Sequence, residues 1–351
     1  MSCALALTCS AHANAQVMRA HYLDVGQADC TLIEFPCGVI LIDAGAEAGQ
    51  EQHTVDLVSE FFDRRTDLGR TIDAVYITHA HIDHTRALRE LASQFPIGAY
   101  IDNGRRGSRT GGGDPRWLVE QIDQGTISTV LRSIADDEIV DLDHRNGLTD
   151  DTIDPILCDD CDPQIRILAG GYSVDPGWGP GEFSNENNHS LVIRVDFGAA
   201  SLLFTGDLEE HAIDTLVHYY EDVDTLDVDI YQVGHHGSHN GTTPSLMDAM
   251  TPHAAICSMG KWLSGRRPDG SAQPFTTYAY GHPRLSIIRM LEETIEGRRS
   301  RPIEILAANR PRKFEEYTVR RRVYATGWDG TVTVRATLDR RFRVTVESTR
   351  R

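Results

Sequence analysis

Hydrophobic and β-branched residues recur along the first two thirds of the chain in runs of four to eight residues, separated by polar, Gly- or Pro-containing segments. Runs of this length and composition are typical of strands with at least one buried face. The pattern predicts strands at Ala20–Val25, Cys30–Phe35, Val39–Ile42, Ala74–Thr78, Ser190–Phe197, Ser201–Thr205 and Asp227–Val233.

Longer segments between these strands have helical spacing, with apolar side chains three and four residues apart. They lie at Val55–Arg65, Thr85–Phe95, Leu208–Tyr220 and Pro283–Glu296. Strand-rich blocks followed by helices favour two mixed sheets packed face to face with helices outside. The fold class that we predict is therefore α/β, as an αββα sandwich.

Two regions depart from this rhythm. Residues 103–165 begin with a basic, Gly-rich segment, continue with a predicted helix at Trp117–Ala135, and end in an acidic stretch. We interpret them as an insertion beside the site, within one domain that spans residues 17–351. The Gly- and Pro-rich segment Gly170–Glu186 is a second candidate for a substrate rim, because loops at strand ends often carry function. The chain closes with a predicted β-meander at Val319–Ala325, Thr331–Thr337 and Phe342–Glu347.

The charge of the chain is unevenly distributed. The net charge is −18, but residues 298–351 carry 15 Lys and Arg against 6 Asp and Glu, which is +9 and leaves −27 for residues 1–297. An acidic body argues against indiscriminate binding to phosphate backbones. The basic strands at 298–351 are then either a solvated surface or a local anchor for an anion.

The first residues resemble an export signal. Ala13-Asn14-Ala15 has the small-x-small form of a cleavage site, although no basic segment precedes it. We expect residues 1–16 to be a signal-peptide remnant and the protein to be exported, to the periplasm or outside the cell. The alternative is a disordered N-terminus on a cytoplasmic protein. The sequence contains no run of about 18 apolar residues, so we predict no membrane span.

The cysteines allow several interpretations. Cys158 and Cys161 form a single Cys-x-x-Cys pair, which is weak support for structural zinc. In an exported protein, a local disulfide between them is the favoured outcome. Cys30, Cys37 and Cys257 lie in strand-like segments, where packing in the core is the default.

A dense group of metal-ligand side chains follows the strand that ends at Thr78. His79-Ala80-His81-Ile82-Asp83-His84 holds three imidazoles and one carboxylate within six residues. In a loop after a strand, these groups can converge on one small volume, and they suit zinc, manganese or iron. Further candidate ligands stand at other strand ends. They are His189, Asp207, and the pair His235 and His236.

Together these motifs resemble the metallo-β-lactamase superfamily, whose pattern is His-x-His-x-Asp-His, His, Asp, His in chain order. The resemblance covers roughly residues 20–335. It implies two divalent metal ions, Zn²⁺ with Mn²⁺ as the alternative. One ion would be bound by His79, His81 and His189, and the other by Asp83, His84 and His235, with Asp207 bridging the two.

Two of these assignments have alternatives. His189 alone would be an ordinary loop histidine, and only its place in the ordered series makes it a ligand. We favour His235 over His236 because it lies closer to the preceding strand. His236 would then donate to the leaving group or orient a ligand.

A finer resemblance is to the hydrolase domain of the competence protein ComEC and its stand-alone relatives. Its most specific marks are Gly234-His-His-Gly-Ser238 and Tyr280-Gly-His282-Pro283. The chain has Ala28 where that family often has glycine, and a histidine at 189 that many ComEC domains lack. Other matching motifs are His21-Tyr-Leu-Asp24-Val-Gly26-Gln27-Ala-Asp29, Leu41-Ile-Asp43-Ala-Gly45, Asn188-His-Ser190, Thr205-Gly-Asp207 and Tyr324–Gly330. We expect the hydrolase module without the membrane channel.

The resemblance implies a phosphodiesterase, with single-stranded DNA as one candidate substrate and therefore nuclease activity. A small phosphodiester, as in phosphorylcholine esterases, is the alternative, and β-lactam hydrolysis is less favoured. Two ions would acidify a water and offset negative charge, while Asp83 orients the water. His282 is a candidate for contacting the phosphate or protonating the leaving group. A non-catalytic metal-binding module is the remaining class, which the complete ligand set disfavours. No protein partner is indicated.

Overall fold

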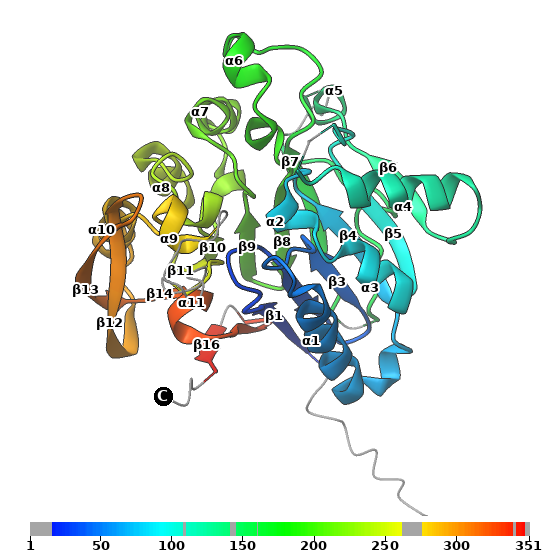
Figure 1. Cartoon of the computed structure of the whole chain (residues 1–351), viewed down its shortest axis with the longest axis horizontal. Helices are drawn as coiled ribbons and strands as arrows, with labels where there is room; N and C mark the ends of the chain where they lie inside the picture. The colour runs from blue at the N-terminus through cyan, green and yellow to red at the C-terminus, as the bar shows by residue number, and fades with distance from the viewer. Residues whose placement is uncertain are drawn as a thin grey trace, which may run out of the picture.

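The computed structural model describes residues 16–107, 110–140, 145–159, 161–261, 276–339 and 342–347. Two large sheets stack face to face, and helices cover their outer faces (Figure 1). The αββα sandwich predicted from the sequence is confirmed.

The first sheet has eight strands in the order β16-β15-β1-β2-β3-β4-β5-β6. The pairs β3–β4, β4–β5 and β5–β6 are parallel, whereas the other pairs, including β2–β3, are antiparallel. The bounds are β1 Val17–Tyr22, β2 Thr31–Glu34, β3 Val39–Ile42, β4 Ile72–Ile77, β5 Ile97–Asp102, β6 Val130–Ser133, β15 Val332–Thr337 and β16 Phe342–Val346.

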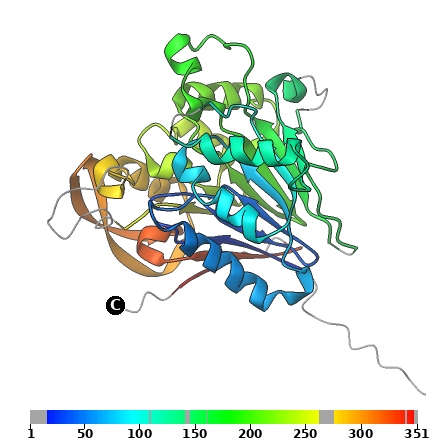
Figure 2. The ribbon, with the colours of Figure 1, turned by 45° about the vertical axis from the view of Figure 1, so that its right-hand side comes forward.

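The second sheet has six strands in the order β14-β11-β10-β9-β8-β7, and β12 and β13 form a separate hairpin. The hairpin lies at one side of the molecule, beside α10 (Figure 2). The bounds are β7 Gln164–Ala169, β8 Val192–Phe197, β9 Ala200–Phe204, β10 Ile230–Gln232, β11 Ala254–Cys257, β14 Val323–Ala325, β12 Arg298–Arg310 and β13 Lys313–Arg321.

The helices divide between the two outer faces. The main helices against the eight-stranded sheet are α1 Glu51–Arg64, α3 Leu88–Gln94 and α4 Gly113–Asp123. Those against the six-stranded sheet are α7 Glu210–Tyr219, α8 Pro244–Met250 and α10 Leu285–Thr294. Shorter helices are α2 Ile82–Thr85, α5 Asp136–Val140, α6 Pro180–Phe183, α9 Thr277–Tyr280 and α11 Thr326–Asp329, and 3-10 turns span Thr66–Leu68, Glu186–His189, Asp224–Leu226 and Gly234–Gly237.

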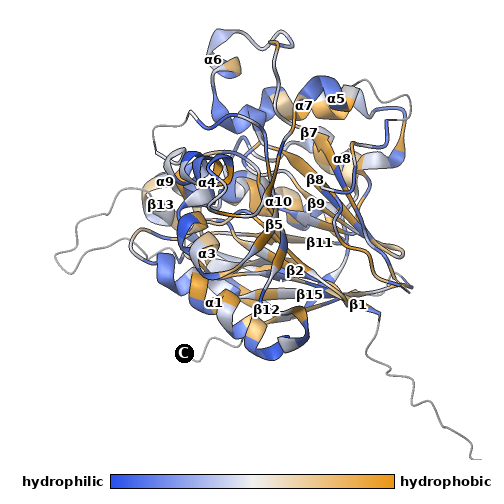
Figure 3. Ribbon diagram, turned by 90° about the vertical axis from the view of Figure 1, so that its right-hand side faces the viewer, coloured by the Kyte–Doolittle hydropathy of each residue, from blue (hydrophilic) through white to orange (hydrophobic). Residues whose placement is uncertain are grey.

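Three apolar layers hold these elements together. The layer between the sheets contains large buried side chains such as Tyr22, Tyr76 and Phe204. Helix α1 shows how the outer layers form, because Val55, Val58 and Phe61 recur at helical spacing and are all buried. Hydrophobic colour is concentrated on the strands, whereas the helices carry mixed colours (Figure 3).

Most predicted elements agree with the structure to within a few residues, and β3 has the predicted bounds. The segment Thr85–Phe95 divides into α2 and α3. The helix predicted at Trp117–Ala135 is wrong beyond Asp123, because the chain then forms the edge strand β6. The predicted C-terminal meander is also wrong: β14 pairs with β11 in one sheet, whereas β15 and β16 extend the other.

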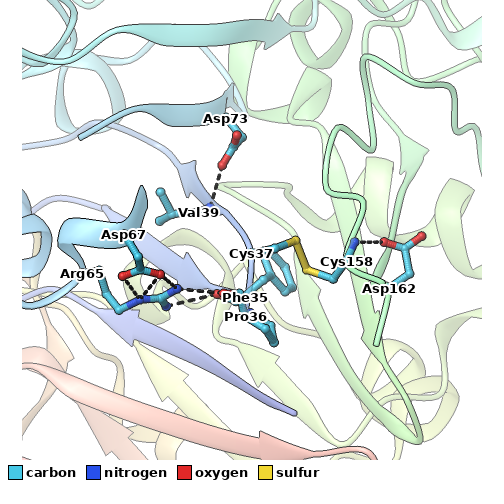
Figure 4. Close-up of a disulfide and its surroundings, with 9 residues drawn as sticks. All are labelled: Phe35, Pro36, Cys37, Val39, Arg65, Asp67, Asp73, Cys158 and Asp162. Carbon is cyan, nitrogen blue, oxygen red and sulfur yellow. Dashed lines mark hydrogen bonds and ion pairs between the residues drawn. A yellow bond between two sulfur atoms is a disulfide. The ribbon is translucent and has the colours of Figure 1, made fainter. Parts of the chain in front are cut away.

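The cysteine prediction needs correction. Cys158 forms a disulfide with Cys37, 121 residues earlier, rather than with Cys161 (Figure 4). Cys37 lies in the turn between β2 and β3, and the segment around Cys158 packs there with a Cα–Cα distance of 5.6 Å, which suits a disulfide. Cys161 is buried beside it, outside the disulfide.

The leader predicted at residues 1–16 lies outside the described residues except for Gln16. Among the helices that the structure describes, none combines the length and apolar composition that crossing a membrane requires.

Candidate metal centre

The motif His79–His84 lies at the carboxyl end of β4, where the two sheets present their loops to one pocket. His81 directly precedes the short helix α2, which contains Asp83 and His84. Asp207 follows β9, and His235 and His236 follow β10. Rigid strands of both sheets therefore position the candidate ligands.

The carboxylate of Asp207 lies at the centre of the cluster. Its Oδ1 is 3.2 Å from His84 Nε2 and 3.8 Å from His236 Nε2. Its Oδ2 is 3.8 Å from His79 Nε2 and 3.7 Å from His235 Nε2. A further close pair is His236 Nε2 and Asp83 Oδ2, at 3.4 Å. Asp207 therefore presents one oxygen to each side of the cluster.

Three groups of three side chains have ligand atoms close enough to share one ion, and two of them face the pocket; the third, Asp29, Asp43 and His84, lies behind it. The two that face the pocket are His79, His81 and Asp207, and Asp83, His84 and His236. The ligand atoms within each group lie within 4.8 Å of one another. The structure thus brings together five of the seven expected ligands, His79, His81, Asp83, His84 and Asp207, and places His236 rather than His235 beside Asp83 and His84.

Hydrogen bonds orient three of the imidazoles. His84 Nδ1 donates to Asp43 Oδ2 at 2.7 Å, and His236 Nδ1 donates to the carbonyl of Ser258 at 2.8 Å. His79 Nδ1 lies 3.2 Å from Thr78 Oγ1. The Nε2 atom of each of these three rings is buried without a hydrogen-bond partner. Buried nitrogen lone pairs that face carboxylates are the donor arrangement expected for a metal ion, so these residues fit the implied group.

The electrostatics of the cluster also favour bound cations. Burial raises the pKa of Asp207, but neighbouring imidazoles, His84 first, lower it well below its usual range. Burial lowers the pKa of His84, but Asp207 and Asp43 outweigh this and raise it well above its usual value. Burial together with the rings of His84 and His81 keeps the pKa of His79 well below its usual value. The buried carboxylates therefore require positive charge, and a divalent ion supplies it.

A tight turn explains why His236 rather than His235 faces Asp83. Both residues have φ +51° within the turn Gly234–Gly237. This left-handed backbone redirects the two side chains relative to the strand β10 that precedes them. His236 is buried beside His84, with ring centroids 5.3 Å apart, whereas His235 stays partly exposed with Nδ1 3.6 Å from Glu209 Oε1.

His189 lies apart from both groups. Its Nε2 donates to the carbonyl of Phe183 at 2.7 Å. The rings of Tyr172, Trp178 and Phe183 surround it, with centroids 5.2–6.1 Å from its own. The Nδ1 atom of His189 is buried without a hydrogen-bond partner among the described residues, but His189 does not line the pocket, so its ligand role remains a prediction.

His282 lines the same pocket from the segment between α9 and α10. Gln27 accepts from Thr277 Oγ1 at 2.7 Å and from the backbone of Gly260, so its amide nitrogen faces His282 Nδ1 at 3.2 Å. His282 Nδ1 is therefore the acceptor, and its Nε2 carries the proton. Burial and the nearby His236 and His235 keep the pKa of His282 well below its usual value, so the ring is a neutral hydrogen-bond donor.

The pocket in front of these groups has a volume of about 540 Å³. Pro311, in the turn of the β12–β13 hairpin, forms part of its wall. Gly281 allows this approach, because a Cβ there would lie 2.8 Å from Pro311. The neighbouring Arg310, Arg312 and Lys313 are exposed, and none of them forms an ion pair with a residue in the described ranges.

Sequence reasoning assigned no role to several residues of the site, although Asp43 and Asp29 lie in motifs that resemble ComEC. Asp43 anchors His84, and it directly follows a correctly predicted strand, so its position was available as a signal. Asp29 is buried near Asp43 and accepts from Gln232, and burial together with Asp43 raises its pKa to about 7. Asn187 and Arg284 also line the pocket. No spacing pattern in the sequence pointed to those two.

Comparison with known proteins identifies the family that the sequence motifs resemble. The model of the metallo-β-lactamase superfamily matches residues 23–261. The ComE operon protein 3 of Bacillus subtilis is 23% identical over 285 residues, which cover 77% of this chain and 30% of that protein. Recombination protein 2 of Haemophilus influenzae is 40% identical over 83 residues, 24% of this chain and 10% of that one. The competence protein ComA of Neisseria gonorrhoeae is 33% identical over 96 residues, 27% of this chain and 14% of that one.

The chain thus spans less than a third of the length of these relatives. Among solved structures, the metallo-β-lactamase fold protein YhfI of Bacillus subtilis matches with a TM-score of 0.40 and 11% identity, over 69% of this chain and 85% of that one. CmlA, a diiron β-hydroxylase of Streptomyces venezuelae, matches with a TM-score of 0.44 and 17% identity, over 79% of this chain and 50% of that one. Because the family model matches more than half of the residues, this chain belongs to the metallo-β-lactamase superfamily.

Proposed function

We propose that the protein is a dinuclear metal-dependent phosphodiesterase that cleaves single-stranded nucleic acid. The observation that carries the proposal is the set of three buried imidazoles, His79, His84 and His236, whose unpartnered Nε2 atoms accompany the carboxylates Asp83 and Asp207. One ion would be held by His79, His81 and Asp207. The other would be held by Asp83, His84 and His236, with Asp207 shared between them.

Two such ions lower the pKa of a water and offset negative charge on a phosphoryl oxygen. The protein side chains orient the reactants. Asp83 has an oxygen on the pocket side, where it can accept a hydrogen bond from the attacking water. The Nε2–H of His282, held in that tautomer by Gln27, can donate to a phosphate oxygen. Because this ring is neutral, we assign it to binding phosphate rather than to protonating the leaving group.

The β12–β13 turn supports a polymeric substrate. Arg310, Arg312 and Lys313 stand beside the pocket wall formed by Pro311, on a chain that is otherwise acidic. A strand whose scissile phosphate lies at the metal centre would place neighbouring phosphates near these side chains. A small phosphodiester remains the second candidate, because a pocket of about 540 Å³ is large enough for a single small molecule.

A three-substrate comparison tests the function. The metal-loaded enzyme is given single-stranded DNA, bis(p-nitrophenyl) phosphate and nitrocefin in parallel, with the Asp207→Asn variant as the matched inactive control. We expect cleavage of the DNA and of the small diester. Turnover of the diester without DNA cleavage would favour the small-molecule alternative. Strong nitrocefin turnover would reject both the nuclease and the small-diester proposals. Metal analysis that finds no bound ion would reject the enzyme altogether.

We also propose that the protein is exported. The Cys37–Cys158 disulfide supports this, because such bonds persist mainly in oxidising compartments. Fractionation of expressing cells, with a thiol-blocking reagent added at lysis, tests the proposal. We expect the oxidised protein outside the cytoplasm, and recovery of reduced protein in the cytoplasm would contradict it.

A further inference from the structure

Asn187 carries a buried oxygen that has no partner. The side chain is 6% exposed, and its Oδ1 atom accepts no hydrogen bond from the residues that the structure describes. Asn187 lines the same pocket as His81 and Asp207. A buried carbonyl oxygen is normally satisfied, so its isolation at the mouth of a metal centre calls for a ligand.

The orientation of this amide is fixed. Asn187 Nδ2 donates to Glu209 Oε1 at 2.7 Å, and a carboxylate can only accept. The other oxygen of Glu209 accepts from Asn185 Nδ2 at 3.0 Å. The backbone N–H of Asn187 donates to Asn185 Oδ1 at 3.2 Å, which holds the turn itself. Because Nδ2 donates its hydrogen bond to Glu209, Oδ1 is the amide atom that can bind a ligand in the pocket.

The neighbouring group of ligands has room for a further ligand atom. His79, His81 and Asp207 provide three atoms, and His235 Nε2 lies 3.7 Å from the Asp207 oxygen that also faces His79, whereas protein-bound divalent ions take about four to eight ligands. The residue expected to complete this set, His189, donates its Nε2–H to the carbonyl of Phe183. Its Nδ1 is buried without a partner among the described residues, but the ring is enclosed by aromatic side chains and does not line the pocket. Asn187 belongs to the same turn, Glu186–His189, and reaches the pocket instead.

We propose that Oδ1 of Asn187 is a ligand of the ion held by His79, His81 and Asp207. This inference rests on the proposed two-metal function and names a ligand that the His-x-His-x-Asp-His pattern does not include. Glu209 is then a positioning residue, because it fixes which end of the Asn187 amide faces the ion. Carboxamide oxygen is an accepted donor for divalent ions.

The test measures metal binding directly. Asn187→Ala, Asn187→Asp and His189→Phe are loaded with Zn²⁺, dialysed and analysed for metal content, and the affinity of each site is measured by chelator competition. For Asn187→Ala we expect one of the two ions to bind at least 10-fold more weakly, with the other unchanged. Asn187→Asp keeps an oxygen that can reach the ion, although it loses the hydrogen bond to Glu209, and should bind this ion more tightly than Asn187→Ala. His189→Phe, which preserves the aromatic surroundings, should bind both ions as the wild type does.

The Asn187→Asp variant separates the two roles of this side chain. A carboxylate at 187 cannot donate to Glu209, so a purely structural role predicts that this variant behaves like Asn187→Ala. Two tightly bound ions in Asn187→Ala, with only KM altered, would overturn the proposal and make Asn187 a substrate contact. Loss of one ion in His189→Phe would overturn it as well. A wild-type protein that binds no metal would instead reject the proposed function itself.

Discussion

At the scale of single residues, the candidate site depends on side chains that do not face the substrate. Asp43 is 1% exposed, and its carboxylate accepts from His84 Nδ1 at 2.7 Å and from the backbone of Thr78 at 2.8 Å. The hydrogen bond to His84 fixes the tautomer that leaves Nε2 available. Such carboxylate–imidazole pairs raise the basicity of the ligand and hold its ring in place.

Asp43→Asn should therefore weaken the ion that His84 binds. We expect the affinity of that site to fall by about 10–100-fold, because the amide no longer supplies the negative charge. Chelator competition measures the change. Asp63→Asn is the matched control, since the interaction of Asp63 within the described ranges is an exposed ion pair with Arg70. Equal metal affinity in both variants would contradict the role of Asp43.

Asp154 predicts a pH dependence of stability. Burial raises its pKa from 3.8 to about 6, and its Oδ1 has no hydrogen-bond partner among the described residues. Because the folded-state pKa is raised, the protonated form is the stabilising one. The stability that it contributes is present below about pH 4 and is lost as the pH rises towards 6.

Asp154→Asn mimics the protonated acid. It should leave the free energy of unfolding unchanged at pH 4 and raise it by about 1 kcal/mol above pH 7, a figure reduced for partial solvent screening. Urea denaturation at the two pH values measures this. A variant that is less stable than the wild type at pH 8 would show that the ionised carboxylate is favourable.

At the scale of elements, the disulfide is the strongest single constraint on the arrangement. It joins the β2–β3 turn to the segment before β7 and closes a loop of 121 residues (Figure 4). Asp162 also accepts from the backbone of Cys158 at 2.9 Å, which fixes the far end of that segment. Cross-links over long loops restrict the unfolded chain most.

Cys37→Ser should lower the free energy of unfolding by about 2–5 kcal/mol, because the unfolded chain regains the freedom of that loop. Denaturation with and without reductant measures it. The wild type should lose about the same amount when reduced, whereas the variant should not respond to reductant. A reductant effect that persists in Cys37→Ser would mean that another cysteine pair matters.

Sequence patterns predicted the elements that bury an apolar stripe and missed those that do not. The run Val39–Ile42 is fully buried and was predicted with its observed bounds. Strand β12 carries four arginines over Arg298–Arg310, so hydrophobic alternation could not identify it. Strand β6 has only four residues at the edge of a sheet, with Val130 exposed, and was taken for the end of a helix.

The candidate site was likewise predicted only in part. The spacing of His79–His84 predicted the cluster because a short loop after a strand allows few arrangements. The choice between His235 and His236 depended instead on two left-handed residues in a four-residue turn, which no hydrophobic period encodes. The amide of Asn187 is oriented by Glu209, 22 residues away in sequence.

At the scale of the whole molecule, the distribution of charge bears on the substrate. Residues 1–297 carry a net charge of −27 and on average repel a nucleic-acid strand, whereas the turn with Arg310, Arg312 and Lys313 attracts one. If the proposed substrate is right, binding should depend on that turn and on salt. Arg310→Ala/Arg312→Ala/Lys313→Ala should weaken binding of single-stranded DNA and reduce the slope of log K against log[salt] by about 2.

The matched control removes the same number of charges from the open end of the hairpin. Arg298→Ala/Arg301→Ala/Arg320→Ala leaves the turn intact and should bind DNA nearly as the wild type does. Fluorescence anisotropy with a labelled oligonucleotide at several salt concentrations measures both variants. Equal losses in the two would mean that only net charge matters, and no loss in either would argue for a small substrate.

The long disulfide loop has one more consequence, for a molecule that has been cut by a protease. The loop from Cys37 to Cys158 contains the His79–His84 motif, whereas Asp207 and His236 lie outside it. A single cleavage between residues 85 and 157 separates the ligands into two fragments that remain covalently joined. Such a nicked enzyme should run as one band on a non-reducing gel and as two after reduction. Its two half-sites could not diffuse apart, so it should refold from denaturant without any dependence on protein concentration.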